Sequence, residues 1–314
     1  MKNRLIITLT LLLLVPFMAF SQKKVSSLDF GPYLGGSNYM GEFTDGYMPL
    51  WNKTKFAGGL ICRYNYGPYL TFKGTAIYGK IEGSDKNFAS DAYRGRRNLS
   101  FKSDIVEFSV QGEWNIRGYE QTKASYGWSP YLFAGVSVFR FNPKAQFNYQ
   151  SYMMDASLQA QDGDWIELQP LGTEGQETTK FNDKRRYSLT QLSVPLGVGA
   201  KWQLDDYWAF GFEFGVRKTF TDYLDDISII GYADPVYFQN EGKLKSLEYS
   251  YRGSEYPNFT PFSQKIYNRG NTIPVDFFYS AQLKITFNIG GESSDYYYQK
   301  KSSSSKFKCV RLVL

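Results

Sequence analysis

The stretch from Trp208 to Phe220, WAFGFEFGVRKTF, alternates strictly between two kinds of side chain. Such a period of two is that of a β-strand, because successive side chains leave a strand on opposite faces. One face carries Trp208, Phe210, Phe212, Phe214 and Val216, whereas the other carries Ala209, Gly211, Glu213, Gly215 and Arg217. Charges and glycines would be an unusual lining for the dry core of a soluble sandwich. In a lipid-embedded barrel the apolar face points outward and the polar face lines the lumen, so the stretch predicts a transmembrane strand.

The same alternation recurs along the chain and predicts eight strands in all. The other segments are residues 28–41, 54–66, 69–82, 103–116, 129–141, 189–204 and 275–289. Short connections at 65–69, 117–128 and 204–208 alternate with long ones at 42–53, 83–103, 142–188 and 221–273. Each predicted strand is about as long as the roughly 9 to 11 residues that a tilted strand needs to cross a membrane. We therefore expect an all-β fold, an eight-stranded antiparallel transmembrane β-barrel with long extracellular loops and short periplasmic turns.

The aromatic content supports the same fold. The chain has 26 Tyr and 25 Phe, and aromatic residues make up 18% of it. Transmembrane barrels carry aromatic girdles at both membrane interfaces. We expect such a belt near the short turns, formed by Tyr64, Tyr66, Tyr69, Trp114, Tyr119, Trp128, Trp202, Tyr207 and Trp208. A soluble, tyrosine-rich β-sandwich is the alternative class.

Three regions are expected along the chain. Residues 1–21 have a basic start and an apolar run, which predicts a cleaved signal peptide. Residues 22–290 would form the barrel, and residues 291–314 a flexible periplasmic tail rich in Ser. No other segment is long enough for a spanning helix, so a membrane location requires a closed barrel in a bacterial outer membrane. Without Lys2 and Arg4 the chain has 34 basic and 30 acidic residues, a balance that does not indicate nucleic-acid binding.

Charged residues on the inward faces are the main candidates for a functional role. The chain contains no His, which excludes Ser/His/Asp and Cys/His catalysis and most zinc sites. We expect no catalytic, cofactor or metal site. A lumen ion network is predicted from Glu107, Glu113, Glu213, Arg217 and Lys284, with Arg63, Lys73 and Lys201 on the same inward faces. Because an eight-stranded barrel is only wide enough for its own side chains, these charges should pair and fill the lumen.

One part of this network can be specified further. Strand 275–289 should neighbour strand 208–220, so Glu213, Arg217 and Lys284 are predicted to share one network. Two other functions stay open. One is a lipid- or peptide-modifying enzyme at the extracellular rim, using Asp222, Asp225 and Asp226; the other is a passive small-solute channel. The basic run 94–102 would either contact lipopolysaccharide phosphates or form a solvated loop.

The two cysteines are expected to lie far apart. Cys62 falls on the outward face of its strand, between Leu60 and Tyr64, where a thiol behaves as a small hydrophobe. Cys309 lies in the predicted tail. An unpaired cysteine in an oxidising compartment suggests an intermolecular disulfide, so Cys309 is a candidate tether to a periplasmic partner. A cysteine without a partner is the alternative.

Several stretches together resemble a known family. They are FGPYLGGSNYMGEF at 30–43, RRNLSFKSDIVEFSV at 96–110, SPYLFAGVSVFRFNPKA at 129–145, LQPLGTEGQ at 168–176 and GVRKTFTDYLDDIS at 215–228. In this order they resemble the Bacteroidota outer-membrane β-barrel family that includes PorG, a component of the type IX secretion system. The resemblance implies a non-enzymatic barrel, held by outer-membrane lipids, that anchors or positions a protein secretion complex. It implies two partners on the periplasmic side, a PorK-like ring lipoprotein and its PorN-like ring partner.

Overall fold

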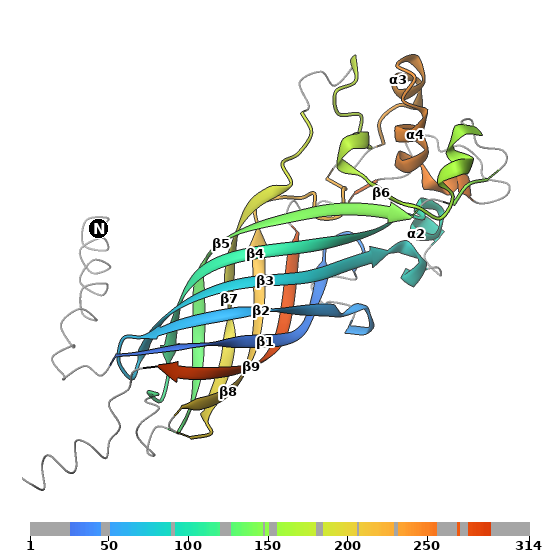
Figure 1. The fold of residues 1–314 in the computed structure, drawn as a ribbon. Helices are drawn as coiled ribbons and strands as arrows, with labels where there is room; N and C mark the ends of the chain where they lie inside the picture. The colour runs from blue at the N-terminus through green and yellow to red at the C-terminus, as the bar shows by residue number, and fades with distance from the viewer. Residues whose placement is uncertain are drawn as a thin grey trace, which may run out of the picture.

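Eight antiparallel strands close into a barrel in the computed structural model, as Figure 1 shows. The model describes residues 26–44, 51–88, 92–119, 127–146, 148–150, 156–179, 185–205, 207–228, 232–255, 269–270 and 276–289. The barrel strands are β1 (Ser27–Met40), β2 (Lys55–Asn65), β3 (Leu70–Ser84), β4 (Ser100–Asn115), β5 (Trp128–Gln146), β7 (Thr190–Gln203), β8 (Trp208–Thr219) and β9 (Phe277–Ile289). Neighbouring strands pair in sequence order, except that β5 pairs with β7, and β9 closes the barrel onto β1. The predicted fold class is therefore confirmed.

Strand positions agree with the alternation, but three strands are longer than predicted. β3, β4 and β5 continue at the end that carries the long connections, and β5 runs to Gln146. Their extensions pair with one another, as in the row Glu82, Lys102 and Lys144, and the short strand β6 (Trp165–Glu167) adds to the edge of β5. The predicted loops 83–103 and 142–188 are thus shorter, because paired backbone continues past the length that a membrane requires.

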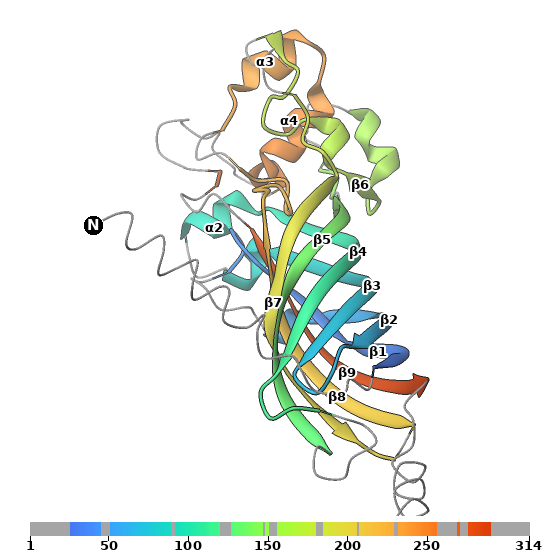
Figure 2. The same cartoon turned by 90° about the vertical axis from the view of Figure 1, so that its left-hand side faces the viewer.

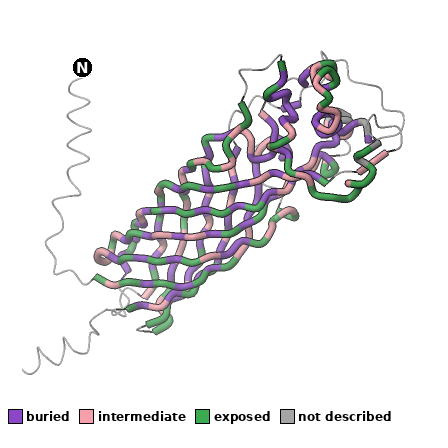
Figure 3. The backbone as a smooth tube through the Cα atoms, turned by 45° about the horizontal axis from the view of Figure 1, so that its top comes forward, coloured by how far each residue is buried: buried purple, intermediate pink, exposed green. Residues whose placement is uncertain are grey.

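The outer wall of the barrel is apolar. Side chains alternate along each strand between buried and exposed, as the banding in Figure 3 shows. The face predicted to be lipid-facing in β8, with Phe212 as its centre, is the outward one, and Glu213 and Arg217 point inward. Cys62 is exposed on the outer wall of β2, as predicted. At Gly35, a side chain would collide with the backbone oxygen of Ala281, so glycine allows β1 and β9 to lie close together.

The two ends of the barrel differ. β1 begins and β9 ends at the same end, where Leu28 pairs with Ile289, and the short turns lie there too. Exposed aromatic side chains gather at this turn end: Tyr64, Tyr69, Trp114, Trp128, Trp202, Tyr207 and Trp208. Of the other two predicted belt residues, Tyr66 is half-buried, and Tyr119 is not at the surface. Its side chain is 3% exposed because it folds inward, with its ring 4.7 Å from Lys201 Nζ, and helps to close the lumen.

A folded cap covers the loop end (Figure 2). It contains helices α2 (Ala92–Arg97), α3 (Pro235–Asn240) and α4 (Leu244–Ser250), together with short 3-10 turns η3 (Asp85–Phe88), η5 (Ala156–Gln161), η6 (Gln169–Leu171) and η8 (Arg252–Glu255). The 3-10 turn η2 (Trp51–Lys53) lies instead against the outer wall, where the ring of Trp51 is 6.4 Å from that of Phe214. α3 and α4 share a small apolar core formed by Tyr232, Ala233, Phe238, Leu247 and Tyr251. Within the part of the chain that the structure describes, no helix combines the length and apolar character of a membrane span. The predicted signal peptide 1–21, the tail 291–314 and Cys309 lie outside the described residues.

Candidate functional site

Glu113 is the centre of an ion network in the turn-end half of the lumen. Its side chain, on β4, has no exposed surface. Oε1 of Glu113 lies 3.1 Å from Arg63 Nε and 3.3 Å from Lys73 Nζ, and Oε2 lies 3.2 Å from Lys201 Nζ. The three cations come from β2, β3 and β7, so one carboxylate on β4 binds side chains from three other strands. The predicted filling of the lumen by paired charges is present at this level.

Glu213 on β8 is the second anion of the same network. Its Oε2 accepts hydrogen bonds from Lys73 Nζ at 2.7 Å, from Tyr131 Oη at 3.0 Å and from Lys284 Nζ. Lys284 Nζ also donates to Tyr131 Oη at 3.0 Å, and Lys73 Nζ lies 4.0 Å from the centre of the Phe133 ring. Cations packed against aromatic rings gain additional electrostatic stabilisation. The predicted pairing of Glu213 with Lys284 is therefore present.

Tyr131 is a network member that the sequence analysis missed. It lies inside the barrel, 1% exposed, with the charged atoms of Arg63, Lys201 and Lys284 within 6 Å of its ring centre. Alternation in β5 could have located it, since Leu132, Ala134 and Val136 on the other parity point outward.

Arg217 belongs to a separate ion pair, which corrects the prediction of one shared network. Its Nε lies 3.1 Å from Oε2 of Glu107 on β4, and its Nη1 donates to the hydroxyl of Ser280. Glu213 makes its contacts with Lys73 and Lys284 instead. Arg217 lies four residues nearer the loop end of β8 than Glu213, and its side chain reaches across the lumen to β4. Sequence alternation fixes the face of a residue but not its partner across a barrel.

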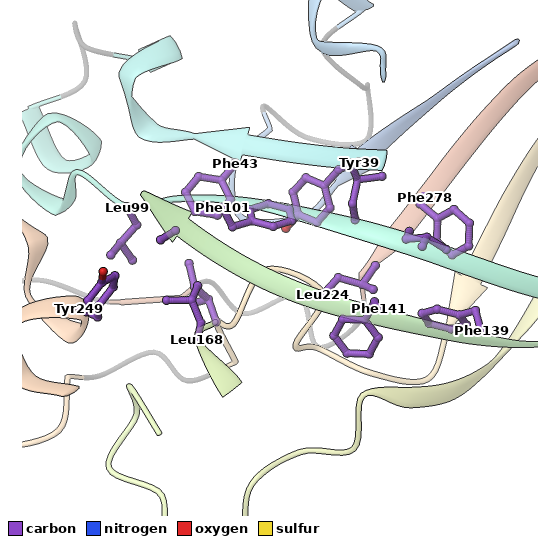
Figure 4. Close-up of a cluster of buried hydrophobic side chains, with 14 residues drawn as sticks. Tyr39, Phe43, Leu99, Phe101, Phe139, Phe141, Leu168, Leu224, Tyr249 and Phe278 are labelled. Atoms are coloured by element: carbon purple, nitrogen blue, oxygen red, sulfur yellow. The ribbon is translucent and has the colours of Figure 1, made fainter. Parts of the chain in front are cut away.

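The loop-end half of the lumen is apolar, where the sequence analysis expected polar residues throughout. Inward side chains from the strands meet side chains from the cap in one cluster: Tyr39, Phe43, Ile81, Leu99, Phe101, Ile105, Phe139, Phe141, Ala145, Leu168, Leu224, Ile227, Tyr249 and Phe278. Figure 4 shows Phe43, Leu168 and Leu224 of the cap directed toward Phe101 and Phe141 of the strands. We call this cluster the apolar plug. Two of its members, Phe101 and Ala145, lie on the extensions of β4 and β5.

Little space remains between the plug and the charges. A cavity bordered by Ile105, Glu107, Arg217 and Ser280 has a volume of only about 10 Å³, the size of about one water molecule. In the described residues the lumen is thus closed by ion pairs toward the turn end and by hydrocarbon toward the loop end. This arrangement is suited to sealing a barrel.

Arg269 fastens two cap segments to each other. It is 2% exposed; Nη1 lies 2.9 Å from Oε1 of Glu174, and Nη2 donates to Thr173 at 3.0 Å. Thr173 also donates to Asp226, and Glu174 accepts from both the backbone and the hydroxyl of Ser228. These contacts bring together LQPLGTEGQ and GVRKTFTDYLDDIS, two of the stretches that carry the family resemblance. Burial raises the pKa of Asp226 to about 6.

Three buried carboxylates meet beside the plug. One oxygen each from Glu42, Asp225 and Asp276 lies within 4.8 Å of the others. Tyr39 Oη donates to Asp225 Oδ2 at 2.6 Å and lies 3.2 Å from an oxygen of each of the other two. We call this group the rim cluster. Three carboxylate oxygens at this spacing are the donor type of a hard divalent cation, although the sequence analysis predicted no metal site.

The burial of the three aspartates named for the enzyme alternative, Asp222, Asp225 and Asp226, bears on that function. Asp225 and Asp226 are at most 2% exposed, because the cap covers them. Asp222 is half-buried, and burial raises its pKa to about 7. The carboxylates named as a possible rim active site are therefore mostly closed off from substrate in this conformation.

We predict that the cap loses stability as the pH rises from about 4.5 to about 8. Burial, reinforced by Asp276, raises the pKa of Glu42 from 4.5 to about 8, and burial also raises the pKa of Asp225 and of Asp276 well above the usual range. Across this window the folded chain binds more protons than the unfolded chain, so stability is greatest below it and falls with rising pH. The rise in the pKa of Glu42 alone lowers the free energy of unfolding by on the order of 5 kcal/mol across this window, since each pKa unit corresponds to about 1.36 kcal/mol.

Urea unfolding of the vesicle-embedded chain near both limits of this window measures the effect. Glu42→Gln has no charge to lose, so its stability should fall by several kcal/mol less than that of the native chain. A pH dependence unchanged by Glu42→Gln would contradict the assignment.

The basic run 94–102 has a structural role at Arg97. Arg97 is 3% exposed and binds both oxygens of Asp85, with Nε–Oδ2 at 2.8 Å and Nη2–Oδ1 at 2.7 Å. It also donates to the backbone oxygen of Arg269 at 2.6 Å. Its guanidinium therefore fastens the β3–β4 connection to the cap, and neither predicted role, contact with lipopolysaccharide or a solvated loop, applies to it.

Comparison with known proteins identifies the family by sequence. The model of DUF6089, described as a domain of unknown function, matches residues 4–161, which is half of the chain. The chain belongs to the DUF6089 family. No curated protein sequence matches this DUF6089 chain.

Several solved structures are similar to the DUF6089 chain, and one of them, OprG, is an outer membrane protein. Neisserial surface protein A is 6% identical, with a TM-score of 0.36, over 85% of this chain and 99% of its own. OprG from Pseudomonas aeruginosa is 8% identical, with a TM-score of 0.36, over 86% and 98%. Ail, the attachment invasion locus protein of Yersinia pestis, is 7% identical, with a TM-score of 0.34, over 85% and 100%.

Proposed function

We propose that the chain is a non-enzymatic barrel of a bacterial outer membrane that anchors or positions a protein secretion complex through its periplasmic side. The observation that carries this proposal is a closed barrel whose wall is apolar and whose interior is filled. Lipid offers no hydrogen-bonding partner to an open sheet edge. The pairing of β4 with β5 closes the sheet, so the barrel has no open edge. The apolar outward faces of the strands then lie against acyl chains, and an N-terminal signal peptide would direct export.

The orientation follows from the two ends of the barrel. The turn end carries the aromatic belt and short turns, so it is assigned to the periplasm, and the cap is assigned to the outside. The filled lumen supports an anchoring role over a channel role. Glu113 with its three cations and the apolar plug lie in series along the only route through the described barrel.

The type IX secretion assignment rests on the sequence resemblance to the family that includes PorG. The partners proposed on that basis are a PorK-like ring lipoprotein and its PorN-like ring partner. Leu204 and Tyr207 offer apolar surface to them at the turn between β7 and β8, where their side chains are 64% and 60% exposed. Cys309 is proposed as an additional covalent tether on the same side.

Deletion of the gene tests the function. We expect cargo proteins of the secretion system to accumulate in the periplasm and to be secreted again on complementation with the native chain. The ring lipoprotein should co-purify with the native chain from detergent-solubilised envelopes. Normal secretion in a clean deletion would contradict the proposal.

A pair of matched variants tests the docking side. Leu204→Glu places a charge on the turn end, and Val236→Glu places one at a similarly exposed apolar position of the cap. Leu204→Glu should reduce co-purification of the ring lipoprotein at least severalfold, and Val236→Glu should leave it unchanged. The reverse result would assign docking to the cap.

A further inference from the structure

A long apolar groove runs across the outer wall of the barrel. Its volume is about 900 Å³, and it crosses β1, β2, β3, β4, β5 and β7. Gly74 lines the groove, and an added side chain there would meet nothing within 4 Å. Larger apolar side chains such as Leu60 and Phe108 border it. The wall is therefore indented around Gly74.

The groove is diagonal with respect to the membrane. It follows a row of paired residues that includes Phe30, Cys62, Gly74, Val110 and Val136. Phe30 lies near the turn end of β1, whereas Leu192, at the other extremity, lies near the loop end of β7. Five strand spacings of about 4.8 Å make the groove about 24 Å long. It thus rises from the inner part of the wall toward the outer leaflet.

Arg140 lies at the upper extremity of the groove. It follows the groove residue Val138 by two positions on the outward face of β5, and its backbone pairs with Val106 and Thr190. Its side chain is exposed. Arg140 makes no hydrogen bond or ion pair with any residue that the structure describes, unlike the neighbouring Lys80 and Lys144, which pair with Asp104 and Glu167. Glu167 is close enough to interact electrostatically with Arg140, but it is hydrogen-bonded to Asn142 and paired with Lys144, so the donors of the Arg140 guanidinium stay open to an anion from outside the chain.

We propose that the groove and Arg140 together bind a phosphate-bearing lipid of the outer leaflet. The guanidinium binds the phosphate, for which its planar donor fork is suited, and an acyl chain lies along the groove over Gly74. The proposal uses the orientation assigned under the proposed function, because the cap must face outward for the phosphate to meet the outer leaflet. Arg140 lies nearer the loop end than the groove does, so the phosphate would lie toward the membrane surface and the acyl chain toward the membrane interior.

Cys62 provides a reporter inside the groove. In full-length chain carrying Cys309→Ser, Cys62 is the single cysteine, and it is exposed on the wall. The rate of its alkylation by N-ethylmaleimide in detergent is measured with phosphatidic acid, with diacylglycerol of the same chains, and with inorganic phosphate. Phosphatidic acid should slow alkylation about tenfold more than diacylglycerol, as expected for one charge-assisted contact. Inorganic phosphate should have no effect, because it does not cover Cys62.

Variants assign the two parts of the site. Arg140→Gln should remove the difference between phosphatidic acid and diacylglycerol, and Gly74→Phe, which fills the groove, should abolish protection by both. Lys218→Gln neutralises an exposed cation on the wall of β8, and Gly112→Phe fills another open glycine position outside the groove. In both control variants, each lipid should slow the alkylation of Cys62 as much as it does in the native chain. Heat-modifiable mobility on gels verifies that each variant is folded.

Equal protection by phosphatidic acid and diacylglycerol, or a difference that persists in Arg140→Gln, would overturn the proposal. If Gly74→Phe does not fold, the comparison of phosphatidic acid with diacylglycerol in Arg140→Gln still tests whether Arg140 binds the phosphate. The assay uses purified chain without secretion partners, so its failure is separate from that of the proposed function. Lipid protection together with normal secretion in the deletion strain would overturn only the secretion role.

Discussion

Replacing Glu113 by leucine should lower the free energy of unfolding by about 5 kcal/mol, the upper end of the range for breaking a buried ion pair. Glu113 forms ion pairs with Arg63, Lys73 and Lys201 inside the lumen. Lys73 keeps its contact with Glu213 in the variant. Arg63 and Lys201 lose the carboxylate that they bind, and both remain buried, so two cations are left without an ion-pair partner.

Urea unfolding in lipid vesicles measures this loss, and heat-modifiable mobility on gels reports the folded barrel. Gln111→Leu is the matched control, because it removes a neutral inward side chain two residues away on the same strand. We expect it to cost about 1 kcal/mol, as for one neutral hydrogen bond. A loss below about 1 kcal/mol in Glu113→Leu would mean that water reaches the cations and that the lumen is not dry.

Arg217→Leu should cost about 3 to 5 kcal/mol, because it leaves the carboxylate of Glu107 buried without its cation. Glu107 Oε2 binds Arg217, and Oε1 has no hydrogen-bonding partner among the described residues. The ion network around Glu213 should be unaffected, since Arg217 is not bound to it.

The double variant Arg217→Leu with Glu107→Leu gives the sharper result. Removing both charges of a buried pair is often neutral or stabilising, because no charge then remains to be solvated. The double variant should therefore recover most of the stability that either single variant loses, in the same unfolding assay. Additive losses would show that the two side chains are not a pair. Arg217→Leu with Glu213→Leu, which combines unpaired residues, should show no such recovery.

Much of the barrel could be predicted because one local rule determines it. The parity of Phe212 against Glu213 sets both the lipid face and the lumen face of β8, and the same parity places Cys62 and Lys284 correctly. Strand number and order follow from counting such segments. The signal peptide, the tail and the partners stay predictions.

The Arg217–Glu107 pair and the apolar plug were not predicted, because the alternation of side chains gives no distances between residues on different strands or loops. Arg217 binds Glu107 across the lumen because of the relative height of β8 and β4, which comes from the register of the closed sheet. The apolar plug needs Phe139 and Phe141 on β5 to meet cap residues such as Leu224, which is far away in sequence. Alternation could have placed both phenylalanines inside, but not the loop that covers them.

Single-channel recording tests most directly the central claim that the barrel is sealed and acts as an anchor. The native chain is inserted into planar lipid bilayers and its conductance is recorded over a range of voltages. The ion pairs of Glu113 and the apolar plug leave no continuous aqueous path through the described lumen, so the current should stay at the baseline of the bilayer. Stable, stepwise single-channel currents from the folded native chain would contradict the sealed-barrel account.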